Sequence, residues 1–144
     1  MKWVVTADST LCRIYEMPGN EKRLALVQEI AHPENRLKKG DYFTSDKPGH
    51  YKTDSSAHGS YTQRSDPKEV GIDRFIREVA LFLNHARNEN TCQQLIIIAL
   101  PHVEGLLMNH LDKHVKELIV RKIPKDVMHL ELAELQMFLE NHRP

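Results

Sequence analysis

Apolar and polar residues follow one another along the first third of the chain in short runs separated by turn residues. The turns are Asp8-Ser9-Thr10 and Pro18-Gly19-Asn20, whose side chains favour tight reversals. The runs are rich in aliphatic, β-branched and aromatic residues, as is typical of strands, and span Trp3–Ala7, Leu11–Met17 and Leu24–Ile30. The pattern predicts a three-stranded meander that ends at His32-Pro33, because proline cannot extend a sheet ladder.

The second half of the chain combines helical spacing with one uninterrupted apolar run. Asp66-Pro67-Lys68-Glu69 is a helix start, with an acceptor at the N-cap, proline at N1 and glutamate at N3. Leu95–Leu100 is apolar without alternation, which is typical of a strand covered on both faces. After it we expect a helix at Val103–Leu111, a strand at Leu118–Val120 and a last helix opened by Pro124-Lys125-Asp126.

The expected order is three strands, a long loop, then helix, strand, helix, strand and helix. A meander followed by βαβ units predicts an α/β fold with a mixed five-stranded sheet, in which strands four and five run parallel to the first and helices cover both faces. This is the layout of the ribonuclease-H-like three-layer architecture. With 144 residues, the chain has a common single-domain size, so we expect one domain over residues 1–144.

The segment from about residue 32 to 66 has no hydrophobic period, and it is the first place to look for function. A loop of this length is uncommon in a compact domain and often carries function. Its cationic and aromatic residues suit contact with RNA, because cationic side chains neutralise phosphates and aromatic rings stack on unpaired bases. The alternative to RNA contact is a solvated loop whose aromatic rings pack on the core. The candidate RNA-binding residues are Arg36, Lys38, Lys39, Tyr42, Lys47, Gly49, His50, Lys52, His58 and Gly59.

Composition limits the remaining classes of function. Twenty basic residues balance twenty acidic ones, so the whole surface is not built to bind nucleic acid, although a local basic patch is compatible with this balance. The longest apolar run is too short to cross a bilayer, and the first residues do not resemble a signal peptide. We therefore expect a cytoplasmic protein without membrane insertion. Cys12 and Cys92 adjoin apolar residues, as buried thiols usually do.

Two patterns could carry metal chemistry. Asp8 stands at the end of the first strand, where a ribonuclease-H-like nuclease places its first metal carboxylate, but two-metal chemistry needs several converging carboxylates. The companions available, Asp73, Glu78 and Asp126, show no spacing that requires convergence. Asp8 also suits a turn and Asp126 a helix cap. His110 and His114 are four residues apart, but no zincin glutamate follows. We therefore expect no metal and no cofactor, and Asp8 remains the candidate for a metal carboxylate.

Several stretches, taken in order, resemble the bacterial proteins labelled "required for attachment to host cells". They are Trp3–Ser9, Cys12–Glu16, His32–Arg36, Ser45–His50, Phe75–Ala80 and Ile123–Leu130, and together they extend over nearly the whole chain. That family is similar in fold to the middle domain of archaeal and eukaryotic class I release factors, which implies a translation- or ribosome-associated ancestry. Those factors carry a Gly-Gly-Gln tip on a long loop, whereas this loop reads Ala57–Gln63 without that tripeptide.

The residues and the resemblance together favour a protein without catalytic activity that contacts the ribosome or other RNA through the long loop. Two alternatives stay open. One is a metal-dependent nuclease centred on Asp8. The other is a protein-interaction module with an indirect effect on host attachment.

Overall fold

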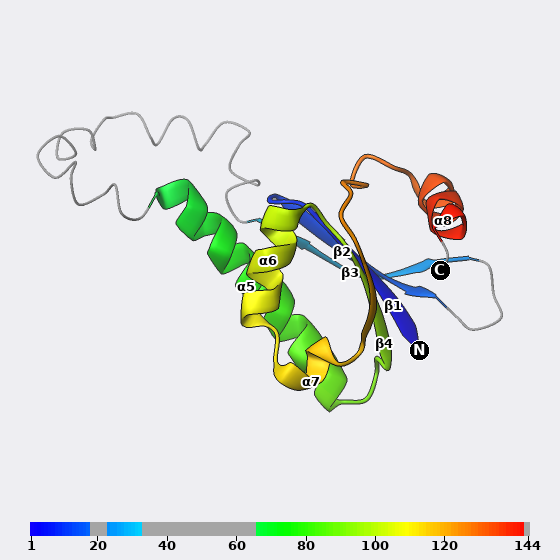
Figure 1. Ribbon diagram of the computed structural model, residues 1–144, viewed down its shortest axis with the longest axis horizontal. Coiled ribbons are helices and arrows are strands. Elements are labelled where there is room, and N and C mark those ends of the chain that lie inside the picture. Colours follow the sequence, from blue (N-terminus) through cyan, green and yellow to red (C-terminus); the bar gives the residue numbers. More distant parts are fainter. Residues whose placement is uncertain (18–22, 33–65, 143–144) are drawn as a thin grey trace, which may run out of the picture.

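The computed structural model describes residues 1–17, 23–32 and 66–142. Within these ranges the chain forms five strands and four helices (Figure 1). The elements are β1 (Lys2–Ala7), β2 (Leu11–Met17), β3 (Ala25–Ala31), α5 (Pro67–Asn88), β4 (Gln94–Ile98), α6 (Pro101–His110), α7 (Lys113–Lys116), β5 (Ile119–Ile123) and α8 (Leu132–Asn141).

The strands form one mixed sheet in the order β3-β2-β1-β4-β5. β1 pairs antiparallel with β2, and β2 pairs antiparallel with β3. β4 runs parallel to β1, and β5 runs parallel to β4. Helices α5, α6 and α7 lie on one side of this sheet and α8 on the other (Figure 1). The predicted α/β fold with a mixed five-stranded sheet and helices on both faces is confirmed, and β4 lies inside the sheet as expected.

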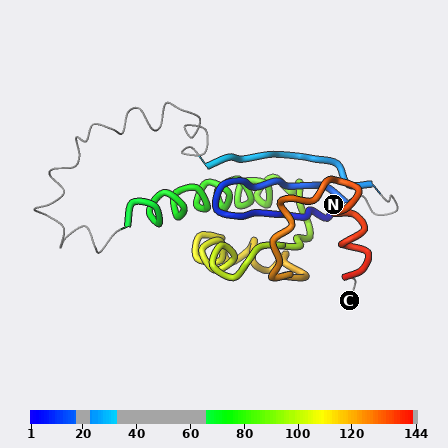
Figure 2. The backbone as a smooth tube through the Cα atoms, turned by 90° about the horizontal axis from the view of Figure 1, so that it is seen from above, coloured from blue at the N-terminus to red at the C-terminus, as the bar shows by residue number. Residues whose placement is uncertain are grey.

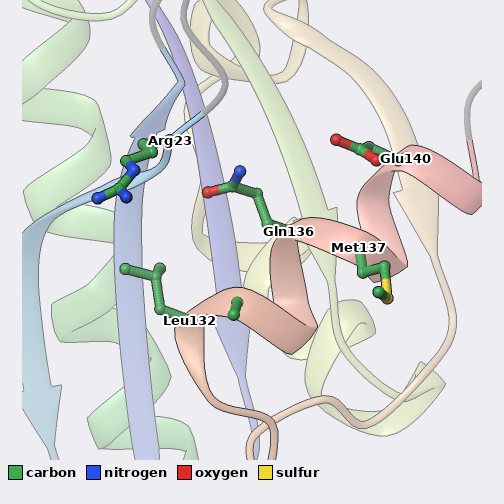
Figure 3. A pocket seen from close by; sticks show the side chains of 6 residues that line it. Arg23, Leu132, Gln136, Met137 and Glu140 are labelled. Atoms are coloured by element: carbon green, nitrogen blue, oxygen red, sulfur yellow. The ribbon is translucent and has the colours of Figure 1, made fainter.

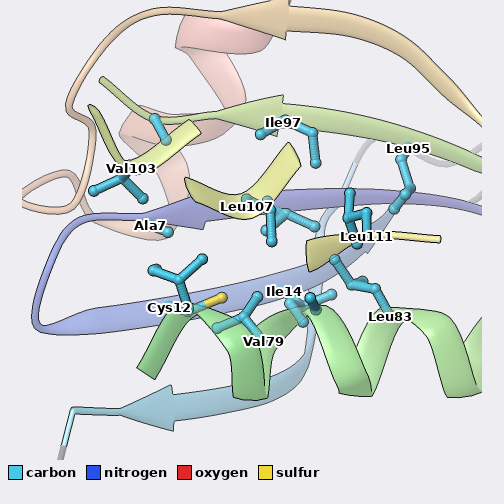
Figure 4. Close-up of a cluster of buried hydrophobic side chains, with 14 of the residues drawn as sticks. Ala7, Cys12, Ile14, Val79, Leu83, Leu95, Ile97, Val103, Leu107 and Leu111 are labelled. Atoms are coloured by element: carbon cyan, nitrogen blue, oxygen red, sulfur yellow. The ribbon is translucent and has the colours of Figure 1, made fainter. Parts of the chain in front are cut away.

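The larger core lies between the sheet and helices α5 and α6. The Asp66 side chain caps α5 by accepting a hydrogen bond from the Lys68 amide, and Pro67 occupies the first turn, so the predicted helix start is confirmed. Apolar residues recur along α5 at helical spacing and face the sheet. Figure 4 shows side chains from strands and helices meeting in one cluster, among them Cys12, Ile14, Val79, Leu83, Ile97 and Leu107. Figure 2 shows α5 and α6 lying side by side.

A smaller core lies on the opposite face, under α8. Leu135 and Leu139 of α8 are buried there against Val4, Tyr15 and Ile96 of the sheet. The uninterrupted apolar run of β4 follows from this arrangement, because its side chains point alternately into the two cores.

Both outer strands carry an extra residue that interrupts their pairing. In β3, Ile14 pairs with Gln28 and Tyr15 with Leu26, so Val27 has no partner position. The pairing of β5 with β4 shifts in the same way at Val120. Such bulges bend and twist an edge strand, which is one way natural sheets avoid adding further strands.

The end of the chain departs from the sequence prediction. The last helix begins at Leu132, not at Pro124, and the Asp126 side chain accepts a hydrogen bond from the Met128 amide in a turn before it. The capping box of Glu131 and Glu134 sets the true start. The prediction also missed α7 and ended the fifth strand three residues early. No helix among the described residues is long and apolar enough to cross a membrane.

Candidate functional site

The carboxyl edge of the sheet gathers the ends of several elements. β1 and β3 run in the same direction because each is antiparallel to β2, so both end at this edge, as does β4. Helices α5 and α6 begin there, since each returns antiparallel to the strands. In open α/β sheets, ligands usually bind outside the carboxyl ends of the strands, where neighbouring connections diverge. Here β1 connects toward β2 and β4 toward β5, so this edge is the candidate site.

His32 directly follows β3 and holds the chain on the folded core just before the candidate loop. Its backbone amide donates to the carbonyl oxygen of Thr10 at 2.9 Å. Its ring is buried and stacks on Phe75 of α5, with the ring centres 5.5 Å apart. Asp66, on the other side of the loop, is the N-cap of the same helix. The chain is therefore held on the folded core immediately before and immediately after residues 33–65.

The predicted RNA-binding residues all fall within that range. Arg36, Lys38, Lys39, Tyr42, Lys47, Gly49, His50, Lys52, His58 and Gly59 lie outside the described residues. What the structure provides is the pair of attachment points, His32 and Asp66.

Asp8 forms the turn between β1 and β2. Its Oδ1 atom accepts three hydrogen bonds, from the Thr10 amide at 2.8 Å, the Thr10 hydroxyl at 3.0 Å and the Leu11 amide at 2.9 Å. The Asp8 amide in turn donates to the Leu11 carbonyl at 3.0 Å. These contacts match the turn role considered for Asp8 from the sequence.

Two of the three carboxylates considered as companions of Asp8 have other neighbours. Asp73 Oδ1 lies 2.9 Å from Nε2 of His110, and Asp126 holds the turn before α8. Among the residues that the structure describes, no three His, Cys, Asp or Glu side chains are grouped so as to hold a metal ion. Within the described residues, Asp8 and its expected companions are therefore not brought together in one cluster.

Histidine–carboxylate pairs join α5 to α6. Besides Asp73 with His110, Glu69 lies 3.1 Å from Nε2 of His102 near the start of both helices. His114 lies in α7, and its Nδ1 is 4.0 Å from Oε1 of Glu117, the residue that ends this helix, so His110 and His114 have different carboxylate partners. The interhelical partners are more than 30 residues apart in sequence. No local pattern could have revealed them.

Neither thiol is placed for nucleophilic chemistry. Both cysteines are buried and free. Burial raises the pKa of the Cys12 thiol far above its usual range, with the Asp8 charge adding to the effect. Burial also raises the pKa of Cys92 to about 11, and its Sγ contacts the Gln94 carbonyl oxygen at 3.4 Å. Because the thiolate is the reactive form, burial and the raised pKa values disfavour a nucleophilic role for either side chain.

A concave feature lies on the α8 side of the sheet (Figure 3). It is an open groove of about 480 Å³ between α8 and the residues that lead into β3. The sequence pattern did not predict it, because its two walls are over 100 residues apart. Its lining residues are Arg23, Leu132, Ala133, Gln136, Met137 and Glu140.

Comparison with known proteins adds one specific match. Residues 3–139 match the family described as "Protein required for attachment to host cells". A solved structure described as "Archaeal protein" aligns with 96% of this chain and 36% of its own length, at 11% identity and a TM-score of 0.44. This chain thus spans about a third of that protein, and a likeness of this size carries no argument about function. None of the curated proteins matches the sequence.

Proposed function

The chain belongs to the family of proteins required for attachment to host cells, and we propose that its molecular role is that of a non-catalytic RNA-binding module. The segment between His32 and Asp66 makes the contact, with ribosomal RNA as the expected target. The choice of ribosomal RNA rests on the resemblance to the release factor middle domain, which implies a ribosome-associated ancestry. It excludes peptide release, because Ala57–Gln63 contains no Gly-Gly-Gln.

The observation that carries the proposal is the way the segment is attached. His32 is fixed by the Thr10 carbonyl and by Phe75, and Asp66 caps α5. The 33 residues between them carry six cationic side chains against four acidic ones, so the segment is net basic in a chain with no net charge; the cations are Arg36, Lys38, Lys39, Lys47, Lys52 and Arg64. A basic, aromatic-containing segment tethered at both ends to the carboxyl edge of a sheet suits contact with a phosphate backbone and unpaired bases.

The non-catalytic part of the proposal is supported by the geometry of Asp8. Three hydrogen bonds engage one of its carboxylate oxygens in the turn, and two of its expected companions, Asp73 and Asp126, contact His110 and the Met128 amide instead. A carboxylate held in this way acts on the backbone of the hairpin, and in the described residues it belongs to no group of three or more His, Cys, Asp or Glu side chains that could hold a cation.

A salt titration of RNA binding tests the proposal. The purified protein is titrated with a single-stranded RNA and with ribosomes at rising salt concentrations. Affinity should fall steeply, because phosphate contacts release counterions. A Lys38→Ala, Lys39→Ala, Lys47→Ala variant should bind more weakly, and its log–log salt slope should be shallower by about 0.7 per lost contact with a single strand.

The matched control removes three lysines elsewhere. Lys113, Lys116 and Lys125 are exposed, and replacing them by alanine changes the net charge by the same amount. If this control loses as much affinity as the loop variant, the effect is general electrostatics and the loop is not the contact surface. Absence of binding by the wild type at low salt would refute the proposal outright. Magnesium-dependent RNA turnover that is lost in Asp8→Asn would favour the nuclease instead.

A further inference from the structure

Helix α8 presents apolar residues on two sides. Leu135 and Leu139 face the sheet and are buried. Leu132 and Met137 are 44% and 63% exposed, and both line the open groove. A helix that covers one face of a soluble domain normally carries polar residues on its outer side. Leu132 and Met137 therefore give the groove beside α8 an apolar lining of the kind found at contact surfaces.

The groove beside α8 has a charge at each end. Arg23 is held close to the helix because the next residue, Leu24, is buried and its amide donates to Oε1 of Gln136 at 2.9 Å. Figure 3 shows Arg23 and Glu140 at opposite ends of the groove, with Gln136 between them. Neither Arg23 nor Glu140 forms an ion pair within residues 1–17, 23–32 and 66–142.

We propose that this groove is a dimerisation surface whose occupant is the α8 groove of a second copy of the chain. A two-fold axis through the middle of the groove reverses its direction, so Arg23 of each copy meets Glu140 of the other. The same axis brings Leu132 of each copy toward Met137 of the other and removes both from water. Such an isologous contact requires a surface that is complementary to itself, and the separated charges provide that complementarity.

Two other places with exposed apolar residues, α5 and the edges of the sheet, do not offer the same match. On α5, Val70 and Leu81 are exposed at helical spacing with Arg74 and Arg77 between them. The corresponding two-fold pairing would place Arg74 of one copy against Arg77 of the other, which is repulsive. The edges of the sheet are also poor candidates, because the bulges at Val27 and Val120 interrupt regular pairing.

The dimer should be weak. A ten-residue helix is only about 15 Å long, so two such grooves bury less than the roughly 1,200 Å² typical of stable interfaces. Association is therefore expected in the range of tens to hundreds of micromolar, and it needs no RNA. The outcome of its test is thus independent of the proposed RNA-binding function.

Sedimentation velocity from about 10 µM to about 1 mM at low salt tests the inference. The wild type should shift from monomer to dimer across this range. Arg23→Glu and Glu140→Arg should each weaken dimerisation at least tenfold, because each places like charges together. The double variant Arg23→Glu, Glu140→Arg restores opposite charges and should recover most of the wild-type association. A residue needed only for the fold of the monomer would not show this rescue.

Met137→Glu should prevent the dimer, and Leu81→Glu is the matched control on α5. Both residues are well exposed, so both variants should keep the circular dichroism and melting behaviour of the wild type. The inference is overturned if the wild type stays monomeric to about 1 mM, if the charge exchange fails to restore association, or if Leu81→Glu is as damaging as Met137→Glu.

Discussion

Replacing Asp8 by alanine distinguishes a turn residue from a metal carboxylate. One oxygen of Asp8 accepts hydrogen bonds from the Thr10 amide, the Thr10 hydroxyl and the Leu11 amide, at 2.8, 3.0 and 2.9 Å. The residue is only partly buried, so the donors released by the substitution can reach water. The loss is then the net value of each bond, about 1 kcal/mol for each amide and less for the hydroxyl.

The sum gives a destabilisation of about 2 kcal/mol for Asp8→Ala. For a chain of this length, that corresponds to a fall in Tm of roughly 6–8 °C. Asp8→Asn keeps an acceptor oxygen in the same place and should lose about half as much. Ser9→Ala, in the same turn, is the control and should change stability by less than about 0.5 kcal/mol.

Urea and thermal unfolding measure these differences. A carboxylate clustered with others for metal binding would give the opposite sign, because removing one of several like charges from the metal-free protein is stabilising. If Asp8→Ala is as stable as the wild type, or more stable, the hydrogen bonds do not hold the turn and the reasoning is wrong.

Two further predictions concern buried groups. The Ile97→Asp variant should not fold, because Ile97 is 1% exposed in an interior strand and an unpaired buried charge costs several kcal/mol out of a total stability of about 5–15 kcal/mol. The control Ile97→Val should cost only about 1 kcal/mol. A soluble Ile97→Asp variant that melts cooperatively would contradict the placement of Ile97 in the core. Cys92 should react with iodoacetamide at pH 8 about 100-fold more slowly in the folded protein than in urea, because its pKa is raised from 9.0 to about 11. Since the pKa of Cys92 is higher in the folded protein than in the unfolded chain, its contribution to the free energy of unfolding is fully present below about pH 9 and is lost as the pH rises through 11. Alkylation is followed by mass spectrometry, and equal rates in the folded and the urea-unfolded protein would show that the thiol is accessible.

Local patterns were sufficient where the structure depends on neighbours in sequence. The helix start at Asp66-Pro67 was predictable because the cap and the proline act within one turn. The last helix was misplaced because Pro124 and Asp126 give the same kind of signal, yet here they form a turn that buries Val127. The capping box at Glu131 competes with that signal, and burial of Val127 in the smaller core decides between them.

In the candidate site, too, the features that depend on neighbouring residues were predictable and the contacts between distant residues were not. The sequence indicated that residues 33–65 carry the basic and aromatic candidates and that Asp8 suits a turn. It did not reveal that His32 stacks on Phe75, which lies 43 positions later, because a ring contact of that kind has no local signature. The pairs of His102 with Glu69 and His110 with Asp73 were hidden for the same reason.

The sequence by itself determined the strands, the order of the elements and the mixed sheet, because apolar period, turn residues and caps act over a few neighbouring positions. It also determined the net charge, the composition of the loop and the family. Only the tertiary structure decided which distant side chains meet. It brought Arg23 beside α8, it placed one oxygen of Asp8 within reach of three donors in the β1–β2 turn, and it left Leu132 and Met137 exposed. These outcomes depend on packing between segments that are far apart in the chain, and packing free energy is a property of the assembled fold.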